Sequence, residues 1–302
     1  MTFQQHSRQT STSISQTIYQ LFLNGLVYSN IWVAAGIASL VFFVQDTLGI
    51  AIDWHPALLI FTAALIPYNL DRIADAYVQK IPDPDAQAYF RNGWGWGMTA
   101  IAVLGTAILL YQAPSPVPLV SCGGLVPLIY GIPLFPMRRE QGLRWYRLKD
   151  IPGSKAWIVC GTITYALIAV PLAYAQMSLT LSAGLTALFL LIFVGTNSHL
   201  FDVRDLESDR KKGVLTLPLM VGVTGNRIIW SVLNLLLLPI LAWGWLHSLA
   251  IPMPLVAIAM SVMNIIFVWT ITPKTPRDVY SIGIDGALFA PSLLVWISRT
   301  IS

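Results

Sequence analysis

Three long stretches of the chain carry no Asp, Glu, Lys or Arg, and their length constrains the fold more than any other feature. They run from Asn92 to Met137, from Ala156 to Phe201 and from Ile228 to Pro273, and each is 46 residues long. A helix needs about 20 residues to cross the apolar part of a membrane. Each stretch therefore has room for two such helices and a tight turn, which Pro114 and Pro116 signal in the first stretch. The sequence predicts three helical hairpins in a lipid bilayer.

The composition agrees with a membrane location. Hydrophobic residues make up 56% of the chain and charged residues 11%, and the mean hydropathy is +0.67, which is far more apolar than an ordinary soluble domain. Apolar segments at about 21–45, 55–71 and 280–298 add three further spans. We therefore expect an all-α polytopic membrane protein with nine transmembrane helices around a central cavity. Residues 1–16 are polar and should form an N-terminal tail, and residues 17–302 should form one transmembrane domain.

The charged residues predict an orientation. In a nine-span chain, 17 of the 18 Lys and Arg residues fall on one side of the membrane, and only Arg299 falls on the other. By the positive-inside rule the basic side is cytoplasmic or its equivalent, so the N-terminus should lie inside and the C-terminus outside. Eleven of the 14 acidic residues lie on that side too, which suggests a face that handles metal or phosphate. Orientation and anionic lipid explain the net charge of +4 better than nucleic acid does.

An acidic cluster lies on the predicted cytoplasmic side, directly after the second uncharged stretch. It consists of Asp202, Asp205 and Asp209. On a continuous helix the three carboxylates would lie within about 60° of one another, where they repel unless a cation lies among them. Hard cations such as Mg²⁺ are held by carboxylates and often share them with substrate phosphates. The cluster therefore predicts a divalent-metal site, and the alternative is a solvated helix end.

A second acidic pair, Asp71 and Asp75, ends the second predicted span on the same side. At this spacing the two carboxylates lie about 40° apart on a helix, and they too could be a metal site or a solvated helix end. Asp285 lies a few residues inside the last span. A carboxylate there should face the bundle interior or a wet cavity, unless it reaches the membrane interface.

These residues match a known family. The segment from Asp202 through Gly213 and Thr216 to Pro218 resembles the second aspartate-rich motif of the UbiA superfamily of intramembrane prenyltransferases. The segment 71–75 is similar to the second half of the family's first motif, which reads NDxxDRxxD. Tyr130 and the segment 148–155 add support, so the resemblance covers most of the chain, from about residue 24 to the end.

The first motif departs from the family pattern. Pro67 stands where the family has Asn, and Tyr68 stands where it has the adjacent Asp. Asn69 does not restore the pattern, because it projects about 160° away from Asp71 on a regular helix.

The resemblance implies a reaction and a set of site residues. The protein would transfer a prenyl group from an isoprenoid diphosphate to a hydrophobic acceptor, aromatic or a quinone or pigment precursor, within a cytoplasmic or thylakoid-type membrane and with its active face cytoplasmic. Mg²⁺ ions bound by carboxylates of both clusters would neutralise the diphosphate, whose loss leaves an allylic carbocation. The implied metal ligands are Asp71, Asp75, Asp202, Asp205 and Asp209. The residues that could bind the diphosphate are Arg72, Lys149, Lys155, Arg210 and Lys211, each of which could instead be an orientation charge, and Tyr130 and Asp285 could line the cavity.

Two other functions stay open at this point. A terpene cyclase on the same scaffold would ionise the same diphosphate but use a double bond of the substrate as the nucleophile. A non-catalytic homologue that acts as a membrane assembly factor would account for the altered first motif. A transporter is disfavoured because ionisable residues are largely absent from the span centres.

Overall fold

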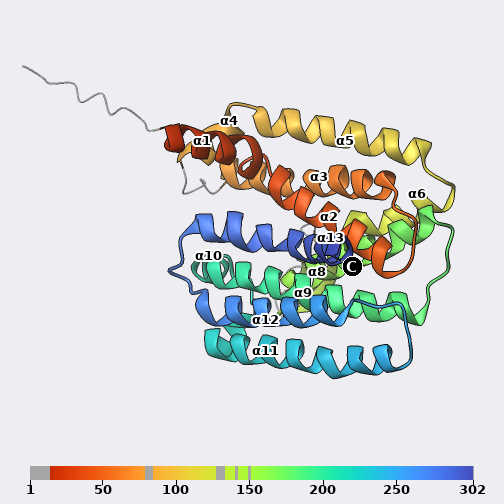
Figure 1. The fold of residues 1–302 in the computed structure, drawn as a ribbon. Coiled ribbons are helices and arrows are strands. Elements are labelled where there is room, and N and C mark those ends of the chain that lie inside the picture. Colours follow the sequence, from red (N-terminus) through yellow and green to blue (C-terminus); the bar gives the residue numbers. More distant parts are fainter. Residues whose placement is uncertain (1–13, 79–83, 127–132, 140–141, 149–150, 302) are drawn as a thin grey trace, which may run out of the picture.

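The protein is a bundle of long helices. The computed structural model describes residues 14–78, 84–126, 133–139, 142–148 and 151–301. Figure 1 shows the long helices side by side, with α5 at one edge of the bundle and α11 at the opposite edge. The helices are α1 (Ile14–Phe22), η1 (Leu23–Val27), α2 (Ile31–Thr47), α3 (Trp54–Val78), α4 (Pro84–Arg91), α5 (Trp94–Gln112), α6 (Pro116–Ser121), η2 (Cys122–Leu125), α8 (Ser154–Tyr174), α9 (Leu181–Arg204), α10 (Leu206–Lys212), α11 (Leu217–Leu246), α12 (Pro254–Thr270), η4 (Val279–Ile284), η5 (Ala287–Phe289) and α13 (Ala290–Ile301).

Helix α9 lies at the centre of the packing. It contacts α8, α11 and α12, and it has the largest buried share of the candidate spans, at 56%. Phe189 and Leu190 of α9 belong to the main apolar core together with Phe43 of α2. The C-terminal end of α9 carries the acidic cluster, so the packing places that cluster within the bundle rather than at its edge.

The count of nine spans is not confirmed. Six helices are long and apolar enough to cross a membrane, and a seventh crossing is formed if Gln16–Val27 and Ile31–Thr47 count as one span with a bend of 63°. Two shorter apolar helices, Pro116–Leu125 and Pro254–Thr270, lie where the other two spans were expected. At 1.5 Å per residue the first of these is about 15 Å long, which is half the thickness of the apolar core of a bilayer. The chain is an integral multi-pass protein, with six or seven crossings by length and composition.

The all-α fold class is confirmed, with one short strand pair as an addition that the sequence did not predict. Strands β1 (Pro133–Arg139) and β2 (Gly142–Arg147) pair antiparallel in a region expected to hold the end of a span and a basic loop. Pro133 and Pro136 explain why helix does not continue there, since proline lacks the amide N–H that a helix needs. Outside this strand pair the described chain has only helices and turns.

Asn69 fixes the bend between η1 and α2. Asn30 at the bend has a left-handed backbone, with φ of 60°, and its side-chain Nδ2 donates a 3.1 Å hydrogen bond to Asn69 Oδ1. Asn69 Nδ2 donates to the Leu65 carbonyl at 2.9 Å and to the Ser29 carbonyl at 3.4 Å. Asn69 is fully buried, so it turns toward α2, in agreement with the rotation predicted from the sequence.

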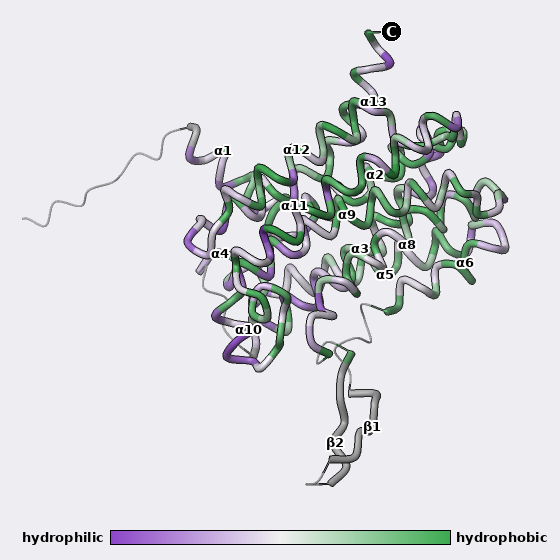
Figure 2. The backbone as a smooth tube through the Cα atoms, turned by 90° about the horizontal axis from the view of Figure 1, so that it is seen from below, coloured by the Kyte–Doolittle hydropathy of each residue, from purple (hydrophilic) through white to green (hydrophobic). Residues whose placement is uncertain are grey.

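The polar residues gather at one end of the bundle. Figure 2 shows the more hydrophilic residues around α4 and α10, while the long helices are mainly hydrophobic.

A separate ion pair joins the ends of α13 and α2, where Arg299 lies 2.5 Å from Asp46.

Candidate functional site

The acidic cluster does not lie on one continuous helix. Helix α9 ends at Arg204, and Asp205, with φ of −93° and ψ of 10°, separates it from α10. Gly213 ends α10 with φ of 70°, and its N–H donates to Arg210 while the next N–H, of Val214, donates to Asp209. This capping pattern requires a left-handed residue and so favours glycine. The short helix brings Asp209 back toward Asp202.

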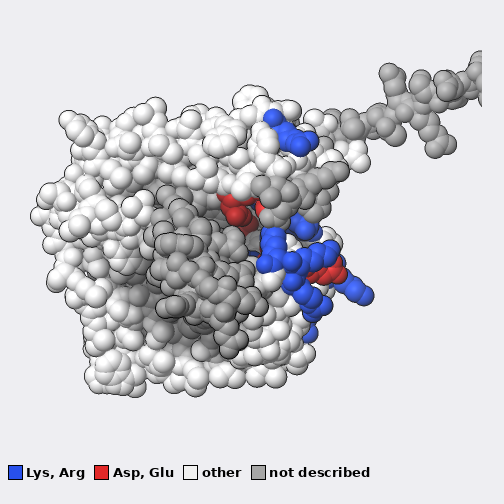
Figure 3. Space-filling view, turned by 180° about the vertical axis from the view of Figure 1, so that it is seen from behind, with Lys and Arg blue, Asp and Glu red and all other residues white. Residues whose placement is uncertain are grey.

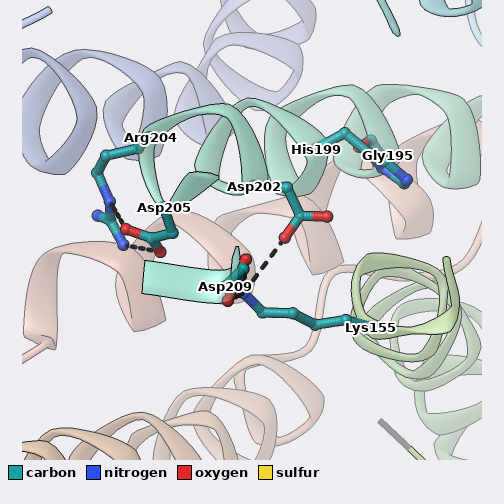
Figure 4. Close-up of polar contacts among 7 residues, drawn as sticks. All are labelled: Lys155, Gly195, His199, Asp202, Arg204, Asp205 and Asp209. Carbon is teal, nitrogen blue, oxygen red and sulfur yellow. Dashed lines mark hydrogen bonds and ion pairs between the residues drawn. The ribbon is translucent and has the colours of Figure 1, made fainter. Parts of the chain in front are cut away.

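Asp202 and Asp209 converge on a lysine of another helix (Figure 4). Lys155, in the first turn of α8, places its Nζ 2.9 and 3.1 Å from the two carboxylate oxygens of Asp209 and 3.4 Å from Asp202 Oδ1. Each aspartate side chain is only 4% exposed, whereas that of Lys155 is 27% exposed. The cation between these two carboxylates is therefore the Lys155 ammonium.

Asp205 turns to a different partner. The Arg204 guanidinium donates from Nε and from a terminal nitrogen to the two Asp205 oxygens, both at 2.8 Å, a bidentate geometry that favours the ionised carboxylate. Burial raises the pKa of Asp205, but the hydrogen bonds and charge of Arg204 outweigh burial and hold the pKa below its usual value. Arg204 also lies over the rings of Phe201 and Tyr280, 4.7 and 5.7 Å from their centroids.

The first acidic pair is not neutralised in this way. Asp71 is exposed and Asp75 is half-buried, and neither forms an ion pair with another residue of the described ranges. The Asp75 carboxylate lies within electrostatic range of Asp205 and of Lys212. The two clusters therefore lie at the same end of the bundle, as the sequence predicted.

A small cavity with three arginines opens beside Asp205. Its volume is about 70 Å³, and Arg72, Arg204 and Arg277 line it together with Asp285. Asp285 thus faces a cavity, one of the two positions that the sequence left open. Residues of η1, α2 and α4 form the apolar part of its wall.

The other predicted site residues are at the surface or outside the described chain. Arg210 and Lys211 are exposed on α10, and Figure 3 shows basic side chains gathered beside acidic ones on one face. Tyr130 and Lys149 lie outside the described residues.

Comparison with known proteins identifies the chain. The family model described as VviA prenyltransferase matches residues 33–296. The chain belongs to the VviA prenyltransferase family. No curated protein matches it.

Solved structures share the fold of this chain. A UbiA homologue from Archaeoglobus fulgidus bound to GPP and Mg²⁺ has a TM-score of 0.63 at 13% identity, over 91% of this chain and 98% of that one. A structure of digeranylgeranylglyceryl phosphate synthase has a TM-score of 0.55 at 12% identity, over 92% of this chain and 96% of that one. The resemblance to the UbiA superfamily is confirmed, and the protein is a prenyltransferase.

The second acidic cluster is paired with basic side chains as it is arranged. Lys155 binds two of its carboxylates and Arg204 binds the third. Among the residues that the structure describes, no group of three or more His, Cys, Asp or Glu side chains could hold a metal. The assignment of Asp202, Asp205 and Asp209 as metal ligands stays a prediction, since basic side chains pair with all three carboxylates in this arrangement. Asp71 and Asp75 form no ion pair with another described residue.

An aromatic cluster next to Asp202 was missed in the sequence. His199, one turn before Asp202 on α9, is buried, and its Nδ1 donates to the Gly195 carbonyl at 2.9 Å. Its ring packs against Trp157 and Trp230, with centroids 5.2 and 4.4 Å away, and the two indole rings stack on each other at 5.4 Å. His199 precedes Asp202 by three residues on the predicted helix, and this spacing could have indicated that the two side chains lie on the same face. Arg204 and Arg277 were also missed, and only the adjacency of Arg204 to Asp205 could have indicated it.

Proposed function

We propose that this VviA-family chain transfers a prenyl group from an isoprenoid diphosphate to a hydrophobic acceptor within the membrane, with Mg²⁺ as cofactor. The observation that carries the proposal is the meeting of two acidic clusters with basic side chains at one end of an apolar helical bundle. Similar structures were solved with GPP or DMAPP and Mg²⁺, which supports an isoprenoid diphosphate as the donor.

The reaction requires one bond to break and one to form. The bond between the allylic carbon and the diphosphate oxygen breaks, and both electrons leave with the diphosphate. A nucleophilic carbon of the acceptor supplies the electron pair of the new bond and then loses a proton. Mg²⁺ bound at Asp71 and Asp75 would neutralise charge that develops on the diphosphate. In this proposal Arg72, Arg210 and Lys211 would donate charge-assisted hydrogen bonds to phosphate oxygens.

The cavity beside Asp285 suits the polar part of the acceptor. Arg72, Arg204 and Asp285 offer both donors and an acceptor at its wall, which oxygen substituents of an aromatic, quinone or pigment precursor could use. Asp285→Asn should therefore lower transfer to the acceptor more than it lowers release of diphosphate.

The experiment incubates purified protein in detergent with radiolabelled geranyl, farnesyl, geranylgeranyl or phytyl diphosphate, with and without Mg²⁺. We expect Mg²⁺-dependent release of diphosphate from at least one of them. Asp75→Ala should reduce it about 100-fold, since several kcal/mol of charge neutralisation are lost. Lys274→Met, which removes an exposed lysine that has no part in the proposed site, should leave it unchanged.

The products separate the alternatives. A prenylated acceptor that forms only when an acceptor is added indicates a transferase, and a cyclic hydrocarbon formed without acceptor indicates a cyclase. Failure to bind any isoprenoid diphosphate would favour the non-catalytic homologue.

A further inference from the structure

Lys155 lies where a metal was expected, and its contacts resemble those of a bound cation. Its Nζ is within 3.1 Å of both oxygens of Asp209 and 3.4 Å from Asp202. These two aspartates come from either side of the Asp205 break, on α9 and on α10. One ammonium thus joins the same elements that a bridging metal ion would join.

The carboxylates leave little surface to a second cation. With 4% of each aspartate side chain exposed, an ion from solvent would compete with the ammonium for their oxygens. Together with the Arg204–Asp205 pair, the five charged side chains carry one net negative charge instead of three. This weakens the attraction for a divalent ion.

The backbone holds Lys155 in this position. Gly153, with φ of 75°, precedes α8, and its N–H donates a 2.6 Å hydrogen bond to the Leu215 carbonyl in the loop after α10. The start of α8 is therefore tied to the segment that carries Asp209. A lysine in the first turn of a helix is opposed by the helix dipole, so the carboxylates, not the helix, account for its placement.

We propose that Lys155 replaces a divalent cation at the second acidic cluster. Asp202 and Asp209 position its ammonium, whose 27% exposed side contacts the diphosphate, and metal binding is confined to Asp71 and Asp75. The inference rests on the proposed function, because it concerns how many divalent ions accompany the diphosphate. This chain would then bind one divalent ion fewer per diphosphate than a protein that holds metal at both clusters.

The experiment counts the bound ions. Full-length protein in detergent is titrated with Mn²⁺ in the presence of a geranyl diphosphate analogue that has sulfur at the bridging position, and free Mn²⁺ is measured by electron paramagnetic resonance. Wild-type protein should bind one Mn²⁺ per chain. Lys155→Met opens the two carboxylates and should bind two, whereas Lys155→Arg keeps the charge and should bind one. Lys274→Met, the matched loss of an exposed lysine, should also bind one.

Further variants keep the inference testable if Lys155→Met does not fold. Asp202→Asn should still bind one Mn²⁺, because Asp202 is not a ligand, and Asp75→Asn should bind none. Two ions on the wild-type protein, a single ion on folded Lys155→Met, or loss of the ion in Asp202→Asn would each overturn the inference and leave the proposed function standing. If the analogue does not bind at any Mn²⁺ concentration, the proposed function itself fails, and this inference fails with it.

Discussion

The Lys155 ammonium lies between two carboxylates that are almost completely removed from solvent. Removing one partner of a buried ion pair leaves an uncompensated charge and costs about 3–5 kcal/mol. We therefore expect Lys155→Met to lower the free energy of unfolding by about that amount, measured by denaturant titration in mixed micelles without divalent ions.

A triple variant tests the cause. Lys155→Met combined with Asp202→Asn and Asp209→Asn removes all three charges, and replacing a whole buried pair is often neutral. It should recover most of the lost stability. A triple variant as unstable as Lys155→Met would mean that packing, not charge, explains the loss.

Asp205 should make stability depend on pH. Its folded-state pKa is held below the unfolded value, which is about 3.9. The ionised Arg204–Asp205 pair therefore stabilises the fold above that unfolded value, and this contribution is lost as the pH falls through the folded pKa. As the pH falls below about 5, the midpoint of thermal unfolding should fall more steeply for wild-type protein than for Asp205→Asn, which cannot ionise. Parallel pH profiles for the two proteins would contradict this.

At the residue scale, the sequence identified most of the charged groups but not their partners. Lys155 and Asp202 lie 47 positions apart, and only the packing of α8 against α9 brings them together. The like charges of the cluster led to the prediction of a divalent metal among them, and the Lys155 ammonium lies beside two of them. Hydropathy and spacing could not distinguish a lysine of another helix from a metal ion.

At the element scale, Asn69 supports the bend of the first span. Asn69→Leu would leave the buried Asn30 amide without its acceptor, and an unsatisfied buried polar group costs about 1–3 kcal/mol. We expect that loss in the free energy of unfolding. Asn30→Gly is the matched variant, because glycine tolerates the left-handed backbone, and it should cost less. Wild-type stability of Asn69→Leu would show that the bend does not depend on this hydrogen bond.

The length of the uncharged stretches predicted the long helices well, because a charged side chain is costly in lipid. The stretch from Ala156 to Phe201 became α8 and α9, and the stretch from Ile228 to Pro273 became most of α11 together with α12. The break at Asp205 was not predictable, since it depends on one pair of backbone angles. The strands at 133–147 were missed because the absence of charge was interpreted as a span, despite two prolines in the first strand.

At the scale of the whole molecule, the orientation is still a prediction. Seven or nine crossings put the two termini on opposite sides of the membrane, whereas six put them on the same side. We expect an N-terminal fluorescent protein fusion to fluoresce in the cytoplasm of a bacterial host and a C-terminal alkaline phosphatase fusion to be active outside it. An inactive phosphatase and a fluorescent C-terminal fusion would contradict the predicted orientation.

The contact between Arg299 and Asp46 bears on how the membrane potential acts on this chain. Arg299 is the one Lys or Arg residue on the predicted outer side. Moving an elementary charge across a potential of 100 mV changes its energy by about 2.3 kcal/mol. Arg299 and Asp46 have opposite signs, so their contributions cancel when both reach the outer side. In the predicted orientation, this ion pair would then require no net electrical work when the two ends of α2 and α13 are translocated.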